Sequence, residues 1–283
     1  MKLQIKIPSD DPRTISQITE HYILEKDLAS QLRHANKSER QQLYTSLYDQ
    51  LFQNTPHHPQ LTRKQDQAAS QAEINRKMRL VKPYLKPDTV FLEVGPGDCQ
   101  FSFEVAKTVQ KVYAVDVSRE ITKNANLPSN FELIISNGCD VPVDENSVSV
   151  AYSNQLMEHL HPEDAYDQLK DLYQCLQPGG VYICITPNRL AGPHDVSKYF
   201  DPVATGFHLQ EYTNQELIDL FLQVGFANVT TYMGGKGVYA RVPRTLTLLC
   251  EWSLSRLPFS IRYQIANFLP FRALLGVILV AQK

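Results

Sequence analysis

The sequence predicts an α/β fold built on a doubly wound, mostly parallel sheet of seven strands, and three observations support it. Residues 90–94 are mostly apolar and lead into Gly95-Pro96-Gly97, as expected of a buried strand followed by a tight turn. Apolar runs of strand length then alternate with helix-like runs as far as residue 233. Asp116 ends the second strand about 20 residues after the glycines, a spacing at which an acidic residue can bind a ribose.

Each element is predicted from its own apolar pattern. The seven expected strands cover residues 89–95, 111–117, 131–136, 148–154, 181–186, 228–233 and 273–283. The expected helices between them cover residues 101–109, 119–126, 162–176 and 214–223. Because strands alternate with helices, most connections are crossovers and the sheet is expected to be mostly parallel.

Two further regions flank this pattern. Large apolar residues recur at three- and four-residue steps through residues 13–50, and a polar helix is expected over residues 65–84. Residues 1–85 are therefore predicted to form a helical N-terminal extension or lid, and residues 86–283 the α/β domain. Within that domain, residues 243–272 carry prolines and arginines among apolar residues, and they predict a helical insert before the last strand.

The composition limits the class of protein. With 43% hydrophobic residues among 283, the chain can bury a core. No apolar run reaches the roughly 18 residues of a membrane span, and the polar start is unlike a signal peptide. The five cysteines show no C-x-x-C spacing, so we expect free thiols in a reducing compartment and a cytoplasmic location.

Charge is distributed unevenly along the chain. Residues 1–80 carry a formal charge of +3, residues 81–240 one of −10, and residues 241–283 one of +5. Nucleic-acid binding depends on neutralising phosphates, so the acidic central part argues against a nucleic-acid partner.

The glycine-rich turn favours a nucleoside ligand over a dinucleotide. A dinucleotide-binding turn has a third glycine at the position of Gln100, where it permits the close helix packing that a pyrophosphate needs. A nicotinamide-dependent oxidoreductase is therefore disfavoured.

At these residues the chain resembles the S-adenosylmethionine-dependent methyltransferases with a Rossmann-like core. The resemblance covers roughly residues 75–240 and the last strand. Five motifs carry it in order: Glu93-Val-Gly95-Pro-Gly97-Asp98, Val115-Asp116-Val117, Ser136–Pro142, Ser153–His159 and Gln177-Pro178-Gly179-Gly180. Each motif alone is a weak signal, but five at the family's spacing form a specific one. The resemblance implies S-adenosylmethionine as the cofactor and methyl transfer as the reaction.

The resemblance also implies a set of cofactor-binding residues. These are Glu93, Gly95, Gly97, Asp116, Asn137, Gly138, Cys139 and Asn154. Asp116 would hold the ribose hydroxyls. The turn at 137–139 would frame the adenine, with the Asn137 carbonyl bonded to the adenine amino group.

A hydroxyl acceptor benefits from a base, and two histidines are candidates. His159 directly follows the fourth strand, where open α/β sheets bind ligands, and His208 lies in a long loop after the fifth strand. The plainer alternatives are that His159 braces the next helix and that His208 is a surface residue.

Gln155-x-x-Glu158-His159 with the later His208 also resembles the metal-binding pattern of methyltransferases that modify small-RNA ends. Gln155 is a neutral and poorer ligand than the glutamate of that pattern. We therefore expect no metal.

The acceptor pocket is expected to involve His194 and Tyr199 from the long loop and Tyr48 and His58 from the N-terminal region. The insert 243–272 is expected to be a helical cap over this pocket. A dimer contact and a peripheral foot on a membrane surface are its alternatives.

The predicted function is methyl transfer from S-adenosylmethionine to a small-molecule or lipid-like acceptor, on oxygen, in small-molecule or secondary metabolism. The rivals are a metal-dependent RNA-end methyltransferase and a non-catalytic binding protein of the same fold. The fold alone does not identify the acceptor.

Overall fold

The structure of the chain is a computed structural model that describes residues 3–8, 11–59, 67–117, 126–235 and 237–283. The described strands are β1 (Val90–Val94), β2 (Lys111–Asp116), β3 (Phe131–Ile135), β4 (Val148–Asn154), β5 (Leu176–Thr186), β6 (Ala227–Gly235), β7 (Val238–Val242) and β8 (Val277–Gln282). They form one sheet in the order β3-β2-β1-β4-β5-β8-β6-β7. The first five strands of that order are parallel to one another, and β8, β6 and β7 pair antiparallel. The predicted α/β class with a doubly wound, mostly parallel sheet is confirmed.

Three details differ from the prediction. The described part of the chain has eight strands and not seven, because residues 238–242 turn back on β6 as the hairpin strand β7. The strand expected over residues 273–283 is the shorter β8, because residues 271–275 are helical. β5 begins at Leu176, earlier than the apolar run alone suggests. The helix expected over 119–126 lies, apart from residue 126, outside the described residues.

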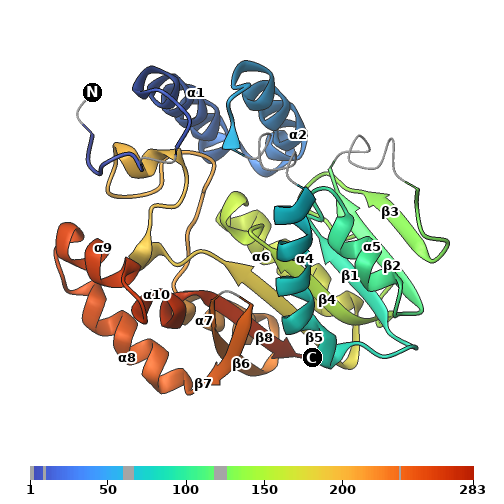
Figure 1. Cartoon of the computed structure of the whole chain (residues 1–283). Coiled ribbons are helices and arrows are strands. Elements are labelled where there is room, and N and C mark those ends of the chain that lie inside the picture. The colour runs from blue at the N-terminus through green and yellow to red at the C-terminus, as the bar shows by residue number, and fades with distance from the viewer. Residues whose placement is uncertain (1–2, 9–10, 60–66, 118–125, 236) are drawn as a thin grey trace.

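Helices cover both faces of the sheet (Figure 1). On one face, α4 (Gln67–Val81) and α5 (Gln100–Ala106) bring Leu80, Phe101 and Val105 into a cluster with Phe91 and Tyr152 of the sheet. On the other face, α6 (Pro162–Cys175) and α7 (Asn214–Val224) contribute to a second and larger core cluster, through residues that include Leu169, Leu172, Leu217 and Phe221. Burial of these apolar surfaces is the main stabilisation of the layered fold.

Two N-terminal helices, α1 (Ile15–His34) and α2 (Lys37–Asn54), lie over the sheet edge where the parallel strands end (Figure 1). Each begins with a capping box, Thr14 with Gln17 and Asn36 with Glu39. The buried Arg40 of α2 forms an ion pair with Asp164 of α6, with an Nε–Oδ2 distance of 2.6 Å. We refer to α1 and α2 as the lid. Because α4 packs on the sheet face, it belongs to the α/β layers, and the division of the chain at residue 85 stays a prediction.

The insert consists of α8 (Arg244–Ser255), α9 (Phe259–Asn267) and α10 (Phe271–Leu275). These helices form a group of their own, on the opposite side of the view from β2 and β3 (Figure 1). Their helical state confirms the prediction from the sequence. None of the described helices is both long enough and apolar enough to cross a bilayer.

Candidate active site

The predicted cofactor residues gather at one edge because four neighbouring parallel strands end there. Gly95 follows β1, Asp116 ends β2, the turn at 136–139 follows β3, and Asn154 ends β4. Backbone hydrogen bonds extend the strand pairing into this edge, as in the 3.0 Å bond from the Gly95 N–H to the Val115 carbonyl. This is the position at which open α/β sheets bind their ligands.

The glycine-rich turn leaves open space on its outer side. Gly95 and Gly97 both have positive φ, +69° and +64°, which disfavours any other residue. A Cβ atom at Gly97 would meet no heavy atom within 4 Å, whereas one at Gly95 would lie 3.1 Å from Leu156 Cδ1. A ligand can therefore approach the backbone at Gly97, so the turn fits a bound cofactor.

Three of the expected cofactor residues have side chains that are engaged within the protein. The buried Glu93 carboxylate accepts a hydrogen bond from Ser102 of α5, and burial raises its pKa to about 7. Asn137 Oδ1 accepts from the backbone N–H groups of Cys139 and Asp140, which occupies both lone pairs. The expected adenine contact of this carbonyl is therefore not supported. The Cys139 side chain is buried in the core, away from the edge.

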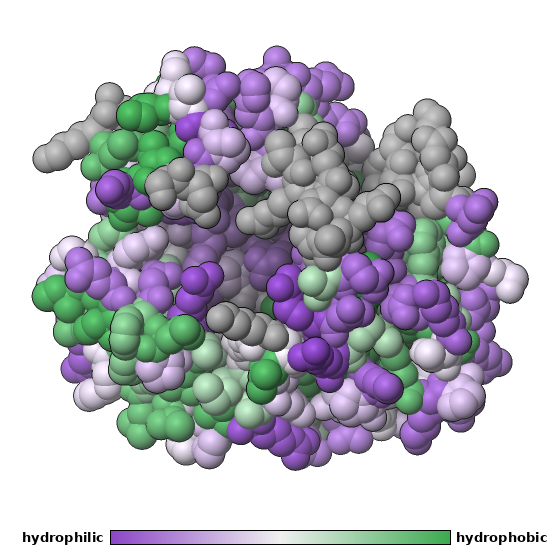
Figure 2. Space-filling model, in the orientation of Figure 1, coloured by the Kyte–Doolittle hydropathy of each residue, from purple (hydrophilic) through white to green (hydrophobic). Residues whose placement is uncertain are grey.

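A cavity of about 190 Å³ lies beside this edge, beneath the lid. Figure 2 shows a hollow below α1 and α2 in which hydrophilic residues gather. All six predicted catalytic and acceptor residues line the cavity: His159, His208, His194, Tyr199, Tyr48 and His58. No described residue of the insert 243–272 lines it, so the prediction that the insert caps this pocket is wrong. The lid covers the pocket instead.

His159 is a neutral histidine with one nitrogen available. Its Nδ1 lies 3.1 Å from the Phe207 carbonyl and 2.8 Å from the Tyr48 hydroxyl. A carbonyl only accepts hydrogen bonds, so Nδ1 carries the proton and Nε2 carries the lone pair. Burial, together with the nearby His208, lowers the pKa of His159 to about 3. The side chain therefore offers an unprotonated nitrogen at neutral pH.

His208, unlike His159, is protonated at neutral pH. Burial opposes its protonation, but the hydrogen bond to Glu211 and the nearby carboxylates of Glu158 and Asp195 outweigh burial and raise its pKa to about 9. Its Nδ1 lies 2.7 Å from Glu211 Oε1, and its ring centroid lies 4.9 Å from that of His159. A protonated imidazole donates hydrogen bonds and accepts no proton, so the structure favours His159 over His208 as the base.

The two loop residues predicted for the acceptor pocket, His194 and Tyr199, both form hydrogen bonds within the protein. His194 Nε2 donates to the Asn188 carbonyl at 3.0 Å, and the Tyr199 hydroxyl donates to Asp11 at 3.2 Å. The loop itself is organised by the buried Asp195, whose carboxylate accepts from the backbone N–H groups of Ser197 and Gly206. Asp195 lines the cavity together with His194 and Tyr199.

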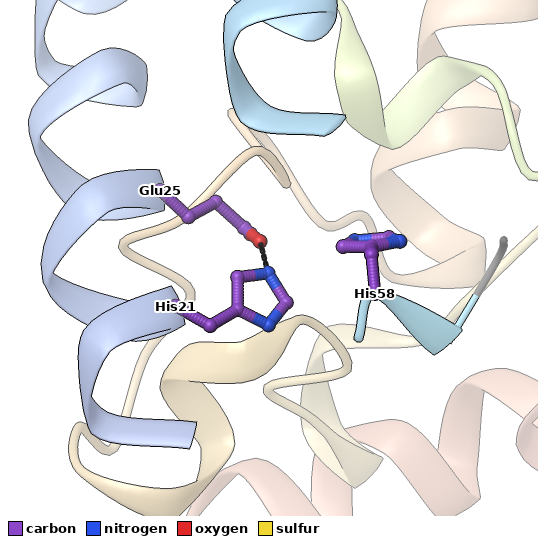
Figure 3. A group of neighbouring side chains, drawn as sticks. All are labelled: His21, Glu25 and His58. Atoms are coloured by element: carbon purple, nitrogen blue, oxygen red, sulfur yellow. Dashed lines mark hydrogen bonds and ion pairs between the residues drawn. The ribbon is translucent and has the colours of Figure 1, made fainter. Parts of the chain in front are cut away.

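His21 and Glu25, which were not predicted as site residues, also line the cavity and lie beside His58 (Figure 3). Arg13 donates to His21 Nδ1 at 3.2 Å, so His21 Nε2 carries the proton that Glu25 accepts at 2.7 Å. The spacing of His21 and Glu25, four residues apart on a helix, is the sequence signal for this pair.

The candidate ligand atoms of these three residues lie within 4.8 Å of one another, as do those of Glu158, His159 and His208. In the group of His21, Glu25 and His58, a metal bound to His21 Nε2 would displace the proton that the hydrogen bonds with Arg13 and Glu25 place on that atom.

The comparisons with known proteins agree with this geometry. Residues 92–184 match the family model described as a methyltransferase domain. A probable S-adenosylmethionine-dependent methyltransferase of Mycolicibacterium smegmatis is 27% identical over 137 residues, which are 48% of this chain and 51% of that protein. Phosphoethanolamine N-methyltransferase 1 of Zea mays is 29% identical over 117 residues, 39% of this chain and 23% of that protein. The chain thus spans about half, or less, of the length of these relatives.

Solved structures share the fold. Phosphoethanolamine N-methyltransferase 1 of Haemonchus contortus, in complex with phosphoethanolamine and S-adenosylhomocysteine, superposes with a TM-score of 0.57 at 14% identity. The match covers 88% of this chain and 50% of that one. An S-adenosylmethionine-dependent methyltransferase from Archaeoglobus fulgidus gives a TM-score of 0.50 at 16% identity, over 85% of this chain and all of that one.

Fold, site and matches together define a class of protein with a Rossmann-like core and a nucleoside cofactor at the edge of its sheet. Residues 92–184 match a methyltransferase domain, and the chain is similar in sequence and fold to S-adenosylmethionine-dependent methyltransferases, whose cofactor is S-adenosylmethionine.

Proposed function

We propose that the protein methylates an oxygen atom of a small-molecule or lipid-like acceptor bound in the cavity beneath the lid. S-adenosylmethionine, when bound, supplies a methyl group already activated by its positive sulfur. The protein must then align the two reactants and manage one proton, and alignment alone can supply about 7–11 kcal/mol of the barrier.

The chain offers residues for holding the cofactor at the sheet edge. The open backbone at Gly97 admits it, and Asp116, which ends the neighbouring strand β2, is placed to accept hydrogen bonds from the ribose hydroxyls. Leu156 packs on Gly95, and His159 follows it by three residues along the chain. This connection between the two sites is what supports placing the acceptor beside the cofactor.

His159 and His208 divide the acid–base work in this proposal. The acceptor hydroxyl gives its proton to His159 Nε2, while the His159 Nδ1–H stays held by the Phe207 carbonyl. The protonated His208 stabilises the negative charge that develops on the acceptor oxygen, so that a weakly basic histidine suffices. The proton reaches His159 as the positive charge of the methyl donor is lost, so the net charge of the cavity does not rise.

The neutral His159 that lines a polar cavity is the observation that carries this proposal. The test is transfer of labelled methyl groups from S-adenosylmethionine to small-molecule and lipid fractions, with the wild type and His159→Ala compared. The variant should lose about 100-fold or more of the transfer and keep its affinity for S-adenosylhomocysteine. His34→Ala, which changes an exposed histidine of α1, is the matched control and should behave as the wild type.

Two results would contradict the proposal. Normal transfer by His159→Ala would remove His159 as the base. S-adenosylhomocysteine binding without methyl transfer to any fraction would favour the rival hypothesis of a non-catalytic binding protein.

A further inference from the structure

The outer side of the insert exposes an unusual number of large apolar side chains. We call this surface the insert face; its members are Leu246, Leu249, Trp252, Ile261, Phe268, Leu269 and Phe271. Trp252 is 57% exposed, Leu249 62% and Phe268 67%. Figure 2 shows hydrophobic residues gathered over the region where Figure 1 has α8 and α9. Contiguous exposed apolar surface of this kind marks a contact with a partner or a membrane.

Helix α8 is apolar on its outward side as well as on part of its inward side. Its buried residues are Thr247, Glu251 and Leu254, and its most exposed large residues are Leu249 and Trp252. A surface helix of a globular protein normally turns its apolar side inward and a polar side outward. The inward side of α8 is anchored by Leu254 and by the polar contacts of Glu251, so the exposed Leu249 and Trp252 are not needed for the core.

Those contacts centre on Glu251. Its carboxylate is 4% exposed and accepts hydrogen bonds from Asn188 Nδ2 at 2.6 Å and from the Asn214 backbone N–H at 2.7 Å. Asn214 is the first residue of α7, where a carboxylate also meets the positive end of the helix dipole. Glu251 thus locks α8 onto the core.

The exposed charges of the insert are all positive. Glu251 is the single acidic residue in 243–272, and it is buried, whereas Arg256 and Arg272 are exposed beside the apolar residues. The Arg256 guanidinium lies over the Trp252 ring, 3.9 Å from its centroid. The surface therefore offers exposed cations next to aromatic and aliphatic side chains and no exposed acid.

We propose that the insert face binds the surface of an anionic lipid bilayer. Its apolar side chains would lie at the boundary between headgroups and acyl chains, and Arg256 and Arg272 would contact lipid phosphates. A second copy of the chain fits this surface less well, because a two-fold contact would bring like charges together. The apolar outward side of α8 and the charge complementarity are independent observations that point to the same partner.

A second cavity lies between the insert and the long loop, and His208 lines both this cavity and the one beneath the lid. The second cavity has a volume of about 500 Å³ and is lined by Ser255 and Arg262 of the insert and by His208 and Glu211 of the long loop. On the function proposed above, it gives a lipid-like acceptor a path from the bilayer to His208. That part of the inference rests on the proposed function, whereas bilayer binding itself does not.

The test is co-sedimentation of the full chain with phosphatidylcholine vesicles, with and without phosphatidylglycerol. The wild type should bind the anionic vesicles, and binding should weaken as salt is raised. R256E/R272E should bind at least about 30-fold more weakly, since each basic residue near such a surface contributes about fivefold. The charge-matched control K86E/K107E, in exposed lysines outside the insert, should bind as the wild type does.

A second pair of variants tests the apolar part. W252S/F268S should also lose binding, and I15S/I23S, in exposed isoleucines of α1, should not. All variants should keep S-adenosylhomocysteine binding and their melting temperature, which shows that they are folded.

Three outcomes would overturn the inference: no binding to either vesicle, equal binding by R256E/R272E, or a concentration-dependent dimer that W252S/F268S abolishes. Vesicle binding without methyl transfer would leave the inference intact and contradict only the proposed function.

Discussion

One buried ion pair contributes to the attachment of the lid to the sheet domain, and its removal should be costly. Arg40 of α2 donates from Nε and Nη2 to the two carboxylate oxygens of Asp164, at 2.6 and 2.8 Å. It also donates to the Ala35 carbonyl at 2.8 Å. Both side chains of the pair are almost completely buried. In Arg40→Ala, Asp164 would keep a hydrogen bond from Tyr44 and lose its charged partner.

A buried charge left without its partner typically costs about 3–5 kcal/mol of stability. We expect the lower end of that range for Arg40→Ala, because Asp164 lies in the first turn of α6, where the helix dipole favours a carboxylate. The assay is urea unfolding followed by circular dichroism, with hydrogen exchange of the α2 amides to show whether the lid opens first.

Glu163 provides the matched control. It is the second carboxylate partner of Arg40, but 69% of its side chain is exposed, so Glu163→Gln should change stability by about 0.5 kcal/mol or less. Replacing both buried partners, in Arg40→Leu with Asp164→Leu, should recover much of the loss. If Arg40→Ala unfolds within about 1 kcal/mol of the wild type, the pair does not anchor the lid and the reasoning fails.

Three further predictions concern the site. Asp116→Ala should weaken S-adenosylhomocysteine binding about 10- to 150-fold by calorimetry, with Asp88→Ala as an exposed control; unchanged affinity would remove the ribose assignment. Methyl transfer should survive EDTA because Gln155 is a poor metal ligand, and a loss restored by magnesium would support the RNA-end rival. The raised pKa of His208 stabilises the fold fully below about pH 6.5, so about 3 kcal/mol should be lost as pH rises through about 9. Urea unfolding at several pH values should show this loss of stability in the wild type and not in His208→Gln.

The fold was predictable because its signals are local. The apolar run before Gly95 and the alternation of strands and helices each specify an element without reference to distant residues. The hairpin strand β7 was missed because Val238–Val242 is short and mostly exposed, and its apolar residues do not alternate with polar ones as in a half-buried strand. The prediction that the insert caps the pocket failed for a related reason. Its apolar residues imply a contact, but their direction is set by Glu251, which is bonded to Asn188 and Asn214 elsewhere in the chain.

The site was predictable in its residue types and not in their charge states. His159, which directly follows a strand, was the leading candidate in the sequence, and His208, in a long loop, was the second. The structure distinguishes them through partners that no spacing reveals, the Phe207 carbonyl for His159 and Glu211 for His208. Burial lowers the pKa of both histidines, but only at His208 do the hydrogen bond to Glu211 and the nearby carboxylates outweigh it.

Helix α2 connects the cofactor edge with the acceptor cavity. A Cβ atom at Gly138, in the turn after β3, would lie 3.3 Å from the Tyr44 ring. One helical turn further on, the Tyr48 hydroxyl lies 2.8 Å from His159 Nδ1. Any movement of α2 that opens the cavity must therefore also move Tyr44 away from the cofactor turn. We therefore expect the binding of cofactor and acceptor to be coupled through α2, and weaker S-adenosylhomocysteine binding by Arg40→Ala, measured by calorimetry, would support this coupling, whereas unchanged affinity would contradict it.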